Sequence, residues 1–298
     1  MRVVLLPLVW LGACTPADTE PSPDTEPAAT EAPEPFYLVS NAPTGAMNKH
    51  APDGSYLGDL IAPNTVLDGA SQIDLTPDGR TLLVSSFSDS VHTFDAITGE
   101  DLGAVPPNDA LRGVSVFAYR PDGVLLVSDF KGGAVHAFDL EERAWLGEFF
   151  APGHLTNPHE VVHIHDSYLV ADYGAGAIVR FNTDGSFRDV LADGPDLRGP
   201  LGMIMAPDGE RLLVTNNHTG RVSIYDPQSG EHLGVLAQDI GLMYPEGMEL
   251  TPEGELLVAS PRNTTIFRIS ADDGAVLGQF EQPAAAEGTV DVLWVAPQ

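Results

Sequence analysis

A short apolar strand pattern recurs along this chain at an almost constant interval. Each copy is a run of apolar residues that contains a valine and ends in Ser, Thr or Ala. The valine falls at positions 39, 84, 127, 170, 214 and 258, so successive copies are 45, 43, 43, 44 and 44 residues apart. A period of about 40–50 residues is typical of repeat architectures, in which every copy forms one supersecondary unit. This interval constrains the fold more than any other feature of the sequence.

Each repeat contains four strand signals separated by turn residues. The first strand of three repeats ends in Pro-Asp-Gly, at 77–79, 121–123 and 207–209. Proline presets the turn, aspartate bonds back to the backbone and glycine supplies a positive φ. From residue 36 onward no ten-residue stretch shows a convincing helical period. We therefore predict an all-β fold, a six-bladed β-propeller over residues 36–298.

The two ends of the repeat region complement each other. No inner strand precedes Tyr37, whereas the segment from Thr289 to Val295 resembles an inner strand with nothing after it. We predict that 289–295 pairs beside 37–41 and completes one blade. Such closure by the N- and C-terminal strands removes the open sheet edge that the ring would otherwise expose.

The repeats resemble those of NHL-type and YVTN-type β-propellers. The segment from Asn157-Pro158 to Asp172-Tyr173 is similar to an NHL unit, and the segment from Leu213 to Asp226 is similar to a YVTN unit. The resemblance implies the architecture and leaves the function open, because propellers include lyases, lactonases, dehydrogenases and binding modules.

The N-terminus has the pattern of an export signal. A positive Met1-Arg2 precedes an apolar run from Val3 to Leu11, which is too short to span a membrane. The run ends in Leu11-Gly12-Ala13-Cys14, which resembles the lipobox of bacterial lipoproteins. The resemblance implies cleavage before Cys14 and lipidation of its thiol. Ordinary cleavage after Ala13 is the alternative, but it leaves a lone cysteine in an exported chain unexplained.

The chain divides into three predicted parts. Residues 1–13 form a lipoprotein signal peptide, residues 14–35 the lipidated cysteine and a disordered linker, and residues 36–298 the propeller. Within the linker, positions 15–35 hold six prolines and six acidic residues but no basic or aromatic residue. This composition cannot bury a core and favours an extended tether. We expect the protein to be exported and lipid-anchored to the bacterial cell envelope, at the outer membrane or facing the periplasm.

The charge balance excludes several partners. Lys and Arg number 14 against 43 Asp and Glu, which gives a formal charge of −29. This charge argues against nucleic acid and against anionic membrane surfaces as electrostatic partners. The single cysteine excludes a disulfide framework. We expect a monomer that contacts the membrane through its lipid anchor and binds an unknown protein or a small polar ligand.

Candidate site residues lie just before the inner strands. In a four-stranded blade this position faces the funnel, the mouth of the central channel. Aligning the repeats places six residues there: Gln72, Arg112, His159, Leu201, Glu246 and Glu287. Histidine and glutamate suit a divalent cation, which is the candidate cofactor. Arginine favours an anionic group nearby.

The same position carries ligands or acid–base residues in gluconolactonase-like and virginiamycin-lyase-like propellers, whose repeat style this chain resembles. The resemblance implies such a role for His159 and Glu246. Gluconolactonase-like enzymes, however, use three oxygen ligands there, whereas this chain has Leu201 and Arg112 in the remaining positions.

Asp129, Asp172 and Asn216 end second strands on the funnel face. Their oxygens suit calcium, but Asp and Asn also cap tight turns by bonding their own backbone. We expect turn chemistry at these positions.

The leading functional hypothesis is a lipid-anchored envelope propeller that acts as a ligand-binding or protein-interaction module. The alternative is a metal-dependent lactonase or lyase of the gluconolactonase-like or virginiamycin-lyase-like type. A third class, quinone-type redox binding, lacks the stacking tryptophans it would need, since Trp10 lies in the signal and Trp145 in an outer strand.

Overall fold

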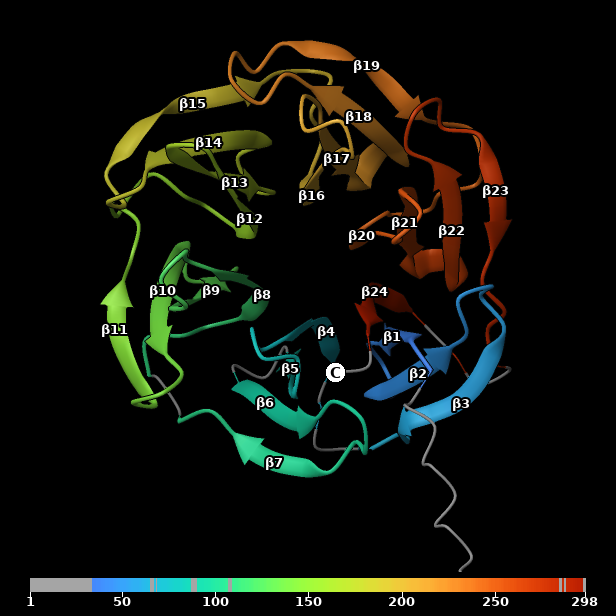
Figure 1. Cartoon of the computed structure of the whole chain (residues 1–298). Coiled ribbons are helices and arrows are strands. Elements are labelled where there is room, and N and C mark those ends of the chain that lie inside the picture. Colours follow the sequence, from blue (N-terminus) through green and yellow to red (C-terminus); the bar gives the residue numbers. More distant parts are fainter. Residues whose placement is uncertain are drawn as a thin grey trace, which may run out of the picture. The chain divides into compact units, whose positions relative to one another are not determined.

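The computed structural model describes residues 34–64, 67, 69–86, 90–106, 109–283, 286 and 288–296. These residues form six antiparallel sheets of four strands, arranged around a central axis as the blades of a propeller (Figure 1). The all-β, six-bladed prediction is confirmed. The predicted signal peptide, Cys14 and most of the linker lie outside the described residues, and so does Glu287.

Five blades follow chain order from the axis outward. Blade 2 contains β4 (Ala70–Leu75), β5 (Thr81–Ser86), β6 (Ser90–Asp95) and β7 (Asp101–Ala104). Blade 3 contains β8 (Val114–Tyr119), β9 (Leu125–Asp129), β10 (Ala134–Asp139) and β11 (Ala144–Glu148). Blade 4 contains β12 (Pro158–Ile164), β13 (Ser167–Asp172), β14 (Ala177–Asn182) and β15 (Phe187–Asp193).

Blades 5 and 6 each add one 3₁₀ turn after the second strand. Blade 5 contains β16 (Pro200–Met205), β17 (Leu212–Asn216), η1 (Asn217–Thr219), β18 (Arg221–Tyr225) and β19 (His232–Ala237). Blade 6 contains β20 (Met248–Leu250), β21 (Glu255–Ser260), η2 (Pro261–Asn263), β22 (Thr265–Ser270) and β23 (Val276–Gln279). None of the helices in the described part of the chain is long and apolar enough to cross a lipid bilayer.

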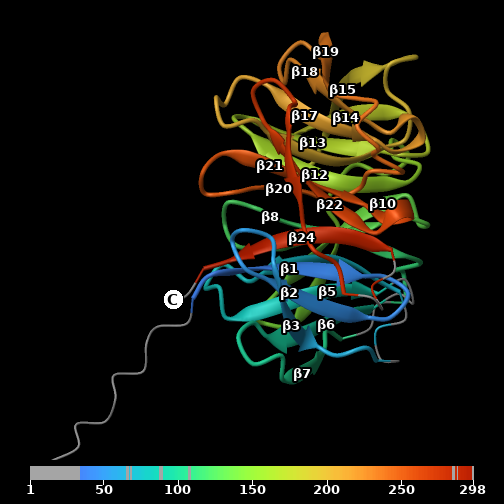
Figure 2. The same cartoon turned by 90° about the vertical axis from the view of Figure 1, so that its right-hand side faces the viewer.

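Blade 1 is assembled from both ends of the chain. It contains β24 (Thr289–Val295), β1 (Phe36–Asn41), β2 (Ala46–His50) and β3 (Tyr56–Ile61). Strand β24 pairs antiparallel with β1, with Phe36 opposite Val295 and Val39 opposite Val292. The two strands lie side by side in both views (Figures 1 and 2). The predicted closure is confirmed.

The core lies between neighbouring blades. The second strands are almost completely buried because each is covered by strands on both sides and by adjacent blades on both faces. Leu38 and Met47 of blade 1, for example, pack in one cluster with Leu82 and Val84 of blade 2. The repeated apolar strand thus supplies the packing between blades, which is why it recurs with the blade period.

The Pro-Asp-Gly turns also fold as predicted. Asp208 Oδ1 accepts hydrogen bonds from the backbone N–H groups of Glu210 and Arg211, and Gly209 has a φ of +70°. Asp78 Oδ1 accepts from the N–H of Arg80 in the same way. These turns reverse the chain between first and second strands.

Candidate functional site

A local break in the inner strands turns one side chain per blade toward the funnel. The ladder between β12 and β13 skips from the Pro158–Asp172 pair to the Val161–Val170 pair, and β4, β8 and β16 show the same shift. Such irregularities re-aim side chains that a regular ladder would hold elsewhere. The first residue of each break is Ser71, Ser115, His159 or Leu201, and Glu246 occupies the matching place before β20.

These five residues line one cavity, which we call the funnel pocket. Its volume is about 230 Å³, and it is lined by Ser71, Ser115, Phe130, His159, Tyr173, Leu201, Asn217 and Glu246. The structure thus brings together His159 and Glu246, which belong to blades 4 and 6. Phe130 lies edge-on to the His159 ring, with ring centroids 6.2 Å apart, and 5.5 Å from the ring of Tyr173. The aromatic residues were not anticipated from the sequence.

Two sequence-based placements are wrong. Arg112 does not line the funnel pocket: its side chain is exposed and borders a separate cavity of about 310 Å³ with Lys131 and His136. Ser115 takes the funnel position of blade 3, three residues farther along. Gln72 is displaced by one residue, since Ser71 lines the funnel pocket and Gln72 faces the channel below. Blades 4, 5 and 6 have a proline directly before the funnel residue, whereas blades 2 and 3 have Ala70 and Val114 there. Without the proline, the repeat alignment did not mark the position.

His159 is buried and electrically neutral. Only 4% of the residue is exposed, and burial lowers the pKa of its imidazole to about 4. A hydrogen bond with the Leu201 backbone acts in the opposite direction. Nδ1 of the ring is buried and has no hydrogen-bond partner among the described residues.

Glu246 carries a proton more readily than an ordinary glutamate. Burial raises the pKa of its carboxyl to about 7. Its backbone is fixed on both sides, because Glu246 N donates to Ala259 O (3.1 Å) and Thr215 Oγ1 donates to Glu246 O (3.0 Å). A Cβ atom at Gly202 would lie 2.4 Å from the Glu246 carbonyl oxygen, so only glycine permits this approach.

Hydroxyl groups connect the funnel positions of successive blades. Each hydroxyl follows the repeated valine and donates to the backbone carbonyl of the funnel residue in the next blade. The pairs are Ser40 to Ser71 (2.7 Å), Ser85 to Ser115 (2.8 Å), Ser128 to His159 (2.7 Å) and Thr215 to Glu246 (3.0 Å). Blade 4 has Ala171 at this position and so lacks the hydroxyl donor.

The donor set of the funnel pocket does not fit a divalent cation. His159 and Glu246 are two ligands, whereas protein sites for zinc or calcium usually supply at least three. In the part of the chain that the structure describes, no group of three or more His, Cys, Asp or Glu side chains is placed to hold a metal ion. The remaining lining is mainly hydroxyl, amide, leucine and aromatic groups.

Asp129, Asp172 and Asn216 serve as turn caps, as expected. Asp172 accepts hydrogen bonds from the N–H groups of Thr156, Asn157 and Ala175. Asp129 accepts from the N–H groups of Arg112 and Gly132. Asn216 Oδ1 accepts from Arg198 N (2.8 Å). These oxygens hold the loops that surround the funnel.

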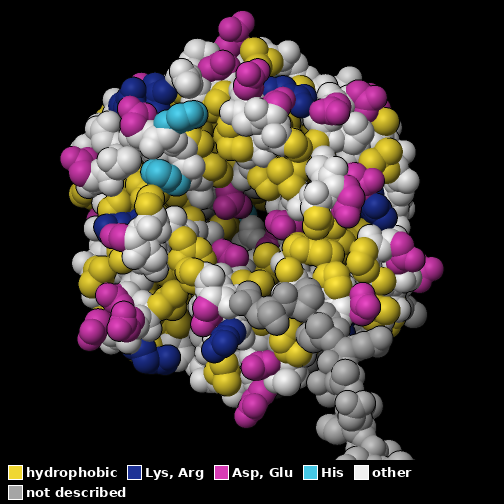
Figure 3. All heavy atoms as spheres, viewed as in Figure 1, with side chains coloured by type: hydrophobic (Ala, Val, Ile, Leu, Met, Phe, Trp, Pro, Cys, Tyr) yellow, Lys and Arg dark blue, Asp and Glu magenta, His cyan; other side chains and the backbone are white. Residues whose placement is uncertain are grey.

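The channel contains an acidic layer that the sequence reasoning missed. Inner strands of four blades turn carboxyl groups toward the axis, and acidic side chains are visible in the central hollow (Figure 3). Members of this layer are Asp74, Glu160, Glu249 and Asp291. Burial, followed by mutual repulsion, raises the pKa of Glu249 and of Glu160, and burial raises that of Asp291 to about 8. The available signal was an acidic residue one position (Glu160) or three positions (Asp74 and Glu249) after the funnel residue, since positions two apart face the same side of a strand.

The sequence matches no protein-family model, and no curated protein matches it either. Solved structures do match. A chain from the nidogen/laminin complex superposes with a TM-score of 0.74 at 16% identity, covering 89% of this chain and 99% of that chain. A protein of unknown function from Bacteroides caccae gives 0.70 at 12% identity, with coverages of 88% and 99%. Virginiamycin B lyase from Staphylococcus aureus gives 0.56 at 15% identity, with coverages of 85% and 76%.

At these identities the likeness shows the fold alone. The chain is a six-bladed β-propeller, an architecture that includes both a component of a protein complex and a lyase. The NHL and YVTN resemblance of the repeats stays a prediction.

Proposed function

We propose that this protein is a lipid-anchored binding module of the cell envelope, and that its funnel pocket holds a small, uncharged ligand. One observation carries the proposal: His159 Nδ1 is buried, lacks a partner among the described residues, and belongs to a side chain that lines a cavity. Buried polar atoms in native proteins are nearly always hydrogen-bonded, so an exception at a cavity indicates a binding position.

The chemistry of the lining defines the ligand class. Neutral His159 carries one N–H donor and one nitrogen acceptor, and protonated Glu246 offers a donor below pH 7. Phe130 and Tyr173 provide aromatic contacts. A small planar molecule with a donor beside an acceptor, such as an aromatic amide, satisfies all of these groups. An anionic ligand is disfavoured, because Arg112 lies elsewhere and the channel below is acidic.

Binding of benzamide and benzoate tests this proposal by calorimetry or by NMR at pH 6. We expect benzamide to bind with a millimolar Kd and benzoate at least about fivefold more weakly, a difference near 1 kcal/mol. His159→Leu should weaken benzamide binding by a similar factor because the polar ring nitrogens are lost. His136→Leu makes the same change at an equally buried histidine outside the funnel pocket and should leave binding unchanged. Equal binding by wild type and His159→Leu would refute the assignment.

Membrane attachment rests on a separate argument. The Leu11-Gly12-Ala13-Cys14 pattern, the lone cysteine and the acidic linker together support lipidation at Cys14. Mass spectrometry of the mature N-terminus should detect a diacylglyceryl cysteine, and Cys14→Ser should release the protein from membranes. An unmodified thiol on the mature chain contradicts this part of the proposal.

Lyase or lactonase chemistry is the second candidate, favoured by one observation. His159 and Glu246 share a cavity, and their environments shift the two pKa values in opposite directions, which is the pattern of a general base and a general acid. Incubation with virginiamycin B and with simple lactones tests it. A binding module leaves them intact; turnover that Glu246→Ala abolishes would replace the binding proposal with an acid–base enzyme.

A further inference from the structure

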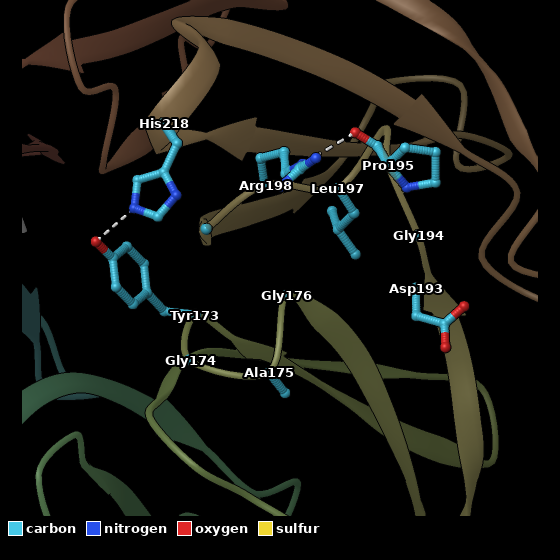
Figure 4. A pocket seen from close by; sticks show the side chains of 11 residues that line it. Tyr173, Gly174, Ala175, Gly176, Asp193, Gly194, Pro195, Leu197, Arg198 and His218 are labelled. Carbon is cyan, nitrogen blue, oxygen red and sulfur yellow. Dashed lines mark hydrogen bonds between the residues drawn. The ribbon is translucent and has the colours of Figure 1, made fainter.

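A second and larger cavity, which we call the inter-blade groove, lies between blades 4 and 5. Its volume is about 610 Å³. One wall is the turn that follows β13, the opposite wall is the connection from β15 to β16, and η1 closes one end (Figure 4). Its lining residues are Tyr173, Gly174, Ala175, Gly176, Asp193, Gly194, Pro195, Leu197, Arg198, Gly199 and His218.

Backbone hydrogen bonds fix Arg198 and His218 next to each other. Arg198 N donates to Asn216 Oδ1 (2.8 Å), and His218 N donates to Arg198 O (3.3 Å). Asn217 N donates to Gly199 O (3.0 Å). The backbone positions of both residues are therefore set by the end of β17, a buried strand.

A tyrosine orients the histidine ring. Tyr173 Oη and His218 Nε2 form a hydrogen bond of 2.7 Å, and the two rings cover Gly199. A Cβ atom there would lie 3.0 Å from the Tyr173 ring and 3.2 Å from the His218 ring, so glycine allows this arrangement. The second ring nitrogen of His218 points away from Tyr173, toward the side of the groove that carries Arg198 (Figure 4).

Several other arginines of the same two blades are held by ion pairs. Arg180 pairs with Asp189 and Arg211 pairs with Asp208. Within the described residues Arg198 makes no ion pair, and its one side-chain hydrogen bond runs from Nε to Pro195 O at 3.4 Å. Its guanidinium is exposed in the groove, and Asp193 lies at the far end (Figure 4).

We propose that the inter-blade groove binds the oxyanion, a carboxylate or a phosphate, of a small ligand between Arg198 and His218. Guanidinium forms paired, charge-assisted hydrogen bonds with either oxyanion. The free nitrogen of His218 adds a second polar contact from the facing side. The glycine-rich walls leave backbone N–H and C=O groups accessible to the rest of the ligand. This site is distinct from the funnel pocket and does not depend on the function proposed there.

Acetate and methyl phosphate are the probes, measured by calorimetry and by NMR of the Arg198 Nε–H and His218 ring signals. The full mature chain is used at about 0.15 M salt, where the Debye length near 8 Å limits repulsion by distant acids. We expect at least one probe to bind with a millimolar Kd and shift both sets of signals. Arg198→Gln should weaken binding about fivefold or more, and Arg198→Lys by less, since charge persists without the planar fork.

Arg221→Gln is the matched control, because it removes the same charge from another arginine of blade 5 that lies outside the groove. It should leave binding unchanged. Loss of binding in both glutamine variants would mean that the net charge of the protein alone causes the binding, and this result would contradict the proposed site. The site is also overturned if neither probe shifts the Arg198 and His218 signals, or if Arg198→Gln binds as wild type does.

Discussion

His159 carries an unsatisfied polar atom in a buried ring. Its Nδ1 has no partner among the described residues, and the residue lines the funnel pocket. Blade 4 has Ala171 where four other blades have a hydroxyl donor. Sequence alignment identified His159 and Glu246 as funnel residues because both follow a proline at the start of an inner strand. It did not reveal the contact with Leu201, which depends on how neighbouring blades are placed.

His159→Leu should change the free energy of unfolding by less than about 1 kcal/mol, because losing the Leu201 hydrogen bond and removing an unsatisfied buried atom oppose each other. Adding Ala171→Ser to that variant should then stabilise it by roughly 1 kcal/mol, since the new hydroxyl supplies the missing donor. Urea unfolding of the single and double variants measures both effects. A loss above about 2 kcal/mol for His159→Leu would show that the histidine is mainly structural.

Titration of the Glu246 carboxyl should make ligand binding depend on pH. Its pKa is raised to about 7, so the donor is present at pH 6 and lost as pH rises through 7. Benzamide affinity should fall by about tenfold between pH 5.5 and pH 8.5, an effect near 1.4 kcal/mol. His159 stays neutral over this range because its pKa is near 4. Glu246→Gln keeps a donor at every pH and should abolish the dependence; a variant with an unchanged pH profile would assign the titration to another group.

Within each second strand, the repeated valine and the residue after it have different structural roles. The valines fill the core between blades, while Ser40, Ser85, Ser128 and Thr215 donate across the blade boundary. The period located every second strand and the closing strand from sequence alone. It did not locate the funnel residues of blades 2 and 3, because Ala70 and Val114 stand there in place of the proline that precedes the funnel residue in blades 4, 5 and 6.

Ser128→Ala should lower the free energy of unfolding by about 1–2 kcal/mol, because the carbonyl of His159 is left without its hydroxyl donor in a buried position. Ser90→Ala is the control: among the described residues its hydroxyl bonds only to His92, on the same strand, and the variant should cost less than about 0.5 kcal/mol. An equal loss of unfolding free energy in the two variants would contradict a special role for the hydroxyls that bond between blades. Chemical denaturation provides the comparison.

For the whole molecule, the ring concentrates acidic groups where its inner strands converge. Asp74, Glu160, Glu249 and Asp291 come from four different blades and share one channel. Asp291 Oδ2 also accepts from Ile73 N (3.1 Å), which joins the closing strand to blade 2. Sequence showed the acidity of the chain but not this convergence, because only ring closure brings distant repeats to one axis.

The acidic layer should make stability fall as pH rises. The pKa values of Asp291 and Glu249 are raised to about 8 in the folded state, so the folded protein holds protons that the unfolded chain releases near pH 4. The contribution of these protons to the free energy of unfolding is fully present below pH 4 and is lost as pH rises through 8. We expect the Tm at pH 8.5 to lie roughly 5 °C or more below that at pH 5.

Asp291→Asn tests this explanation. The amide oxygen still accepts from Ile73, and the group no longer ionises, so Tm at pH 8.5 should rise toward its value at pH 5. Asp193→Asn removes an exposed charge outside the channel and should leave the pH profile unchanged. Stability that increases between pH 5 and pH 8.5 would contradict the assignment.

The way β1 joins the ring also has a mechanical consequence. The chain leaves the propeller through β1, which is hydrogen-bonded to β24 on one side and to β2 on the other. Tension on the segment before Glu34 therefore loads two ladders in shear, along the strand axis, so that many hydrogen bonds resist together. An outermost strand such as β3 would instead be peeled away one bond at a time. In the lipid-anchored form that we propose, the propeller would thus be held through an interior strand, and the pairing that closes the ring would make that attachment resistant to force.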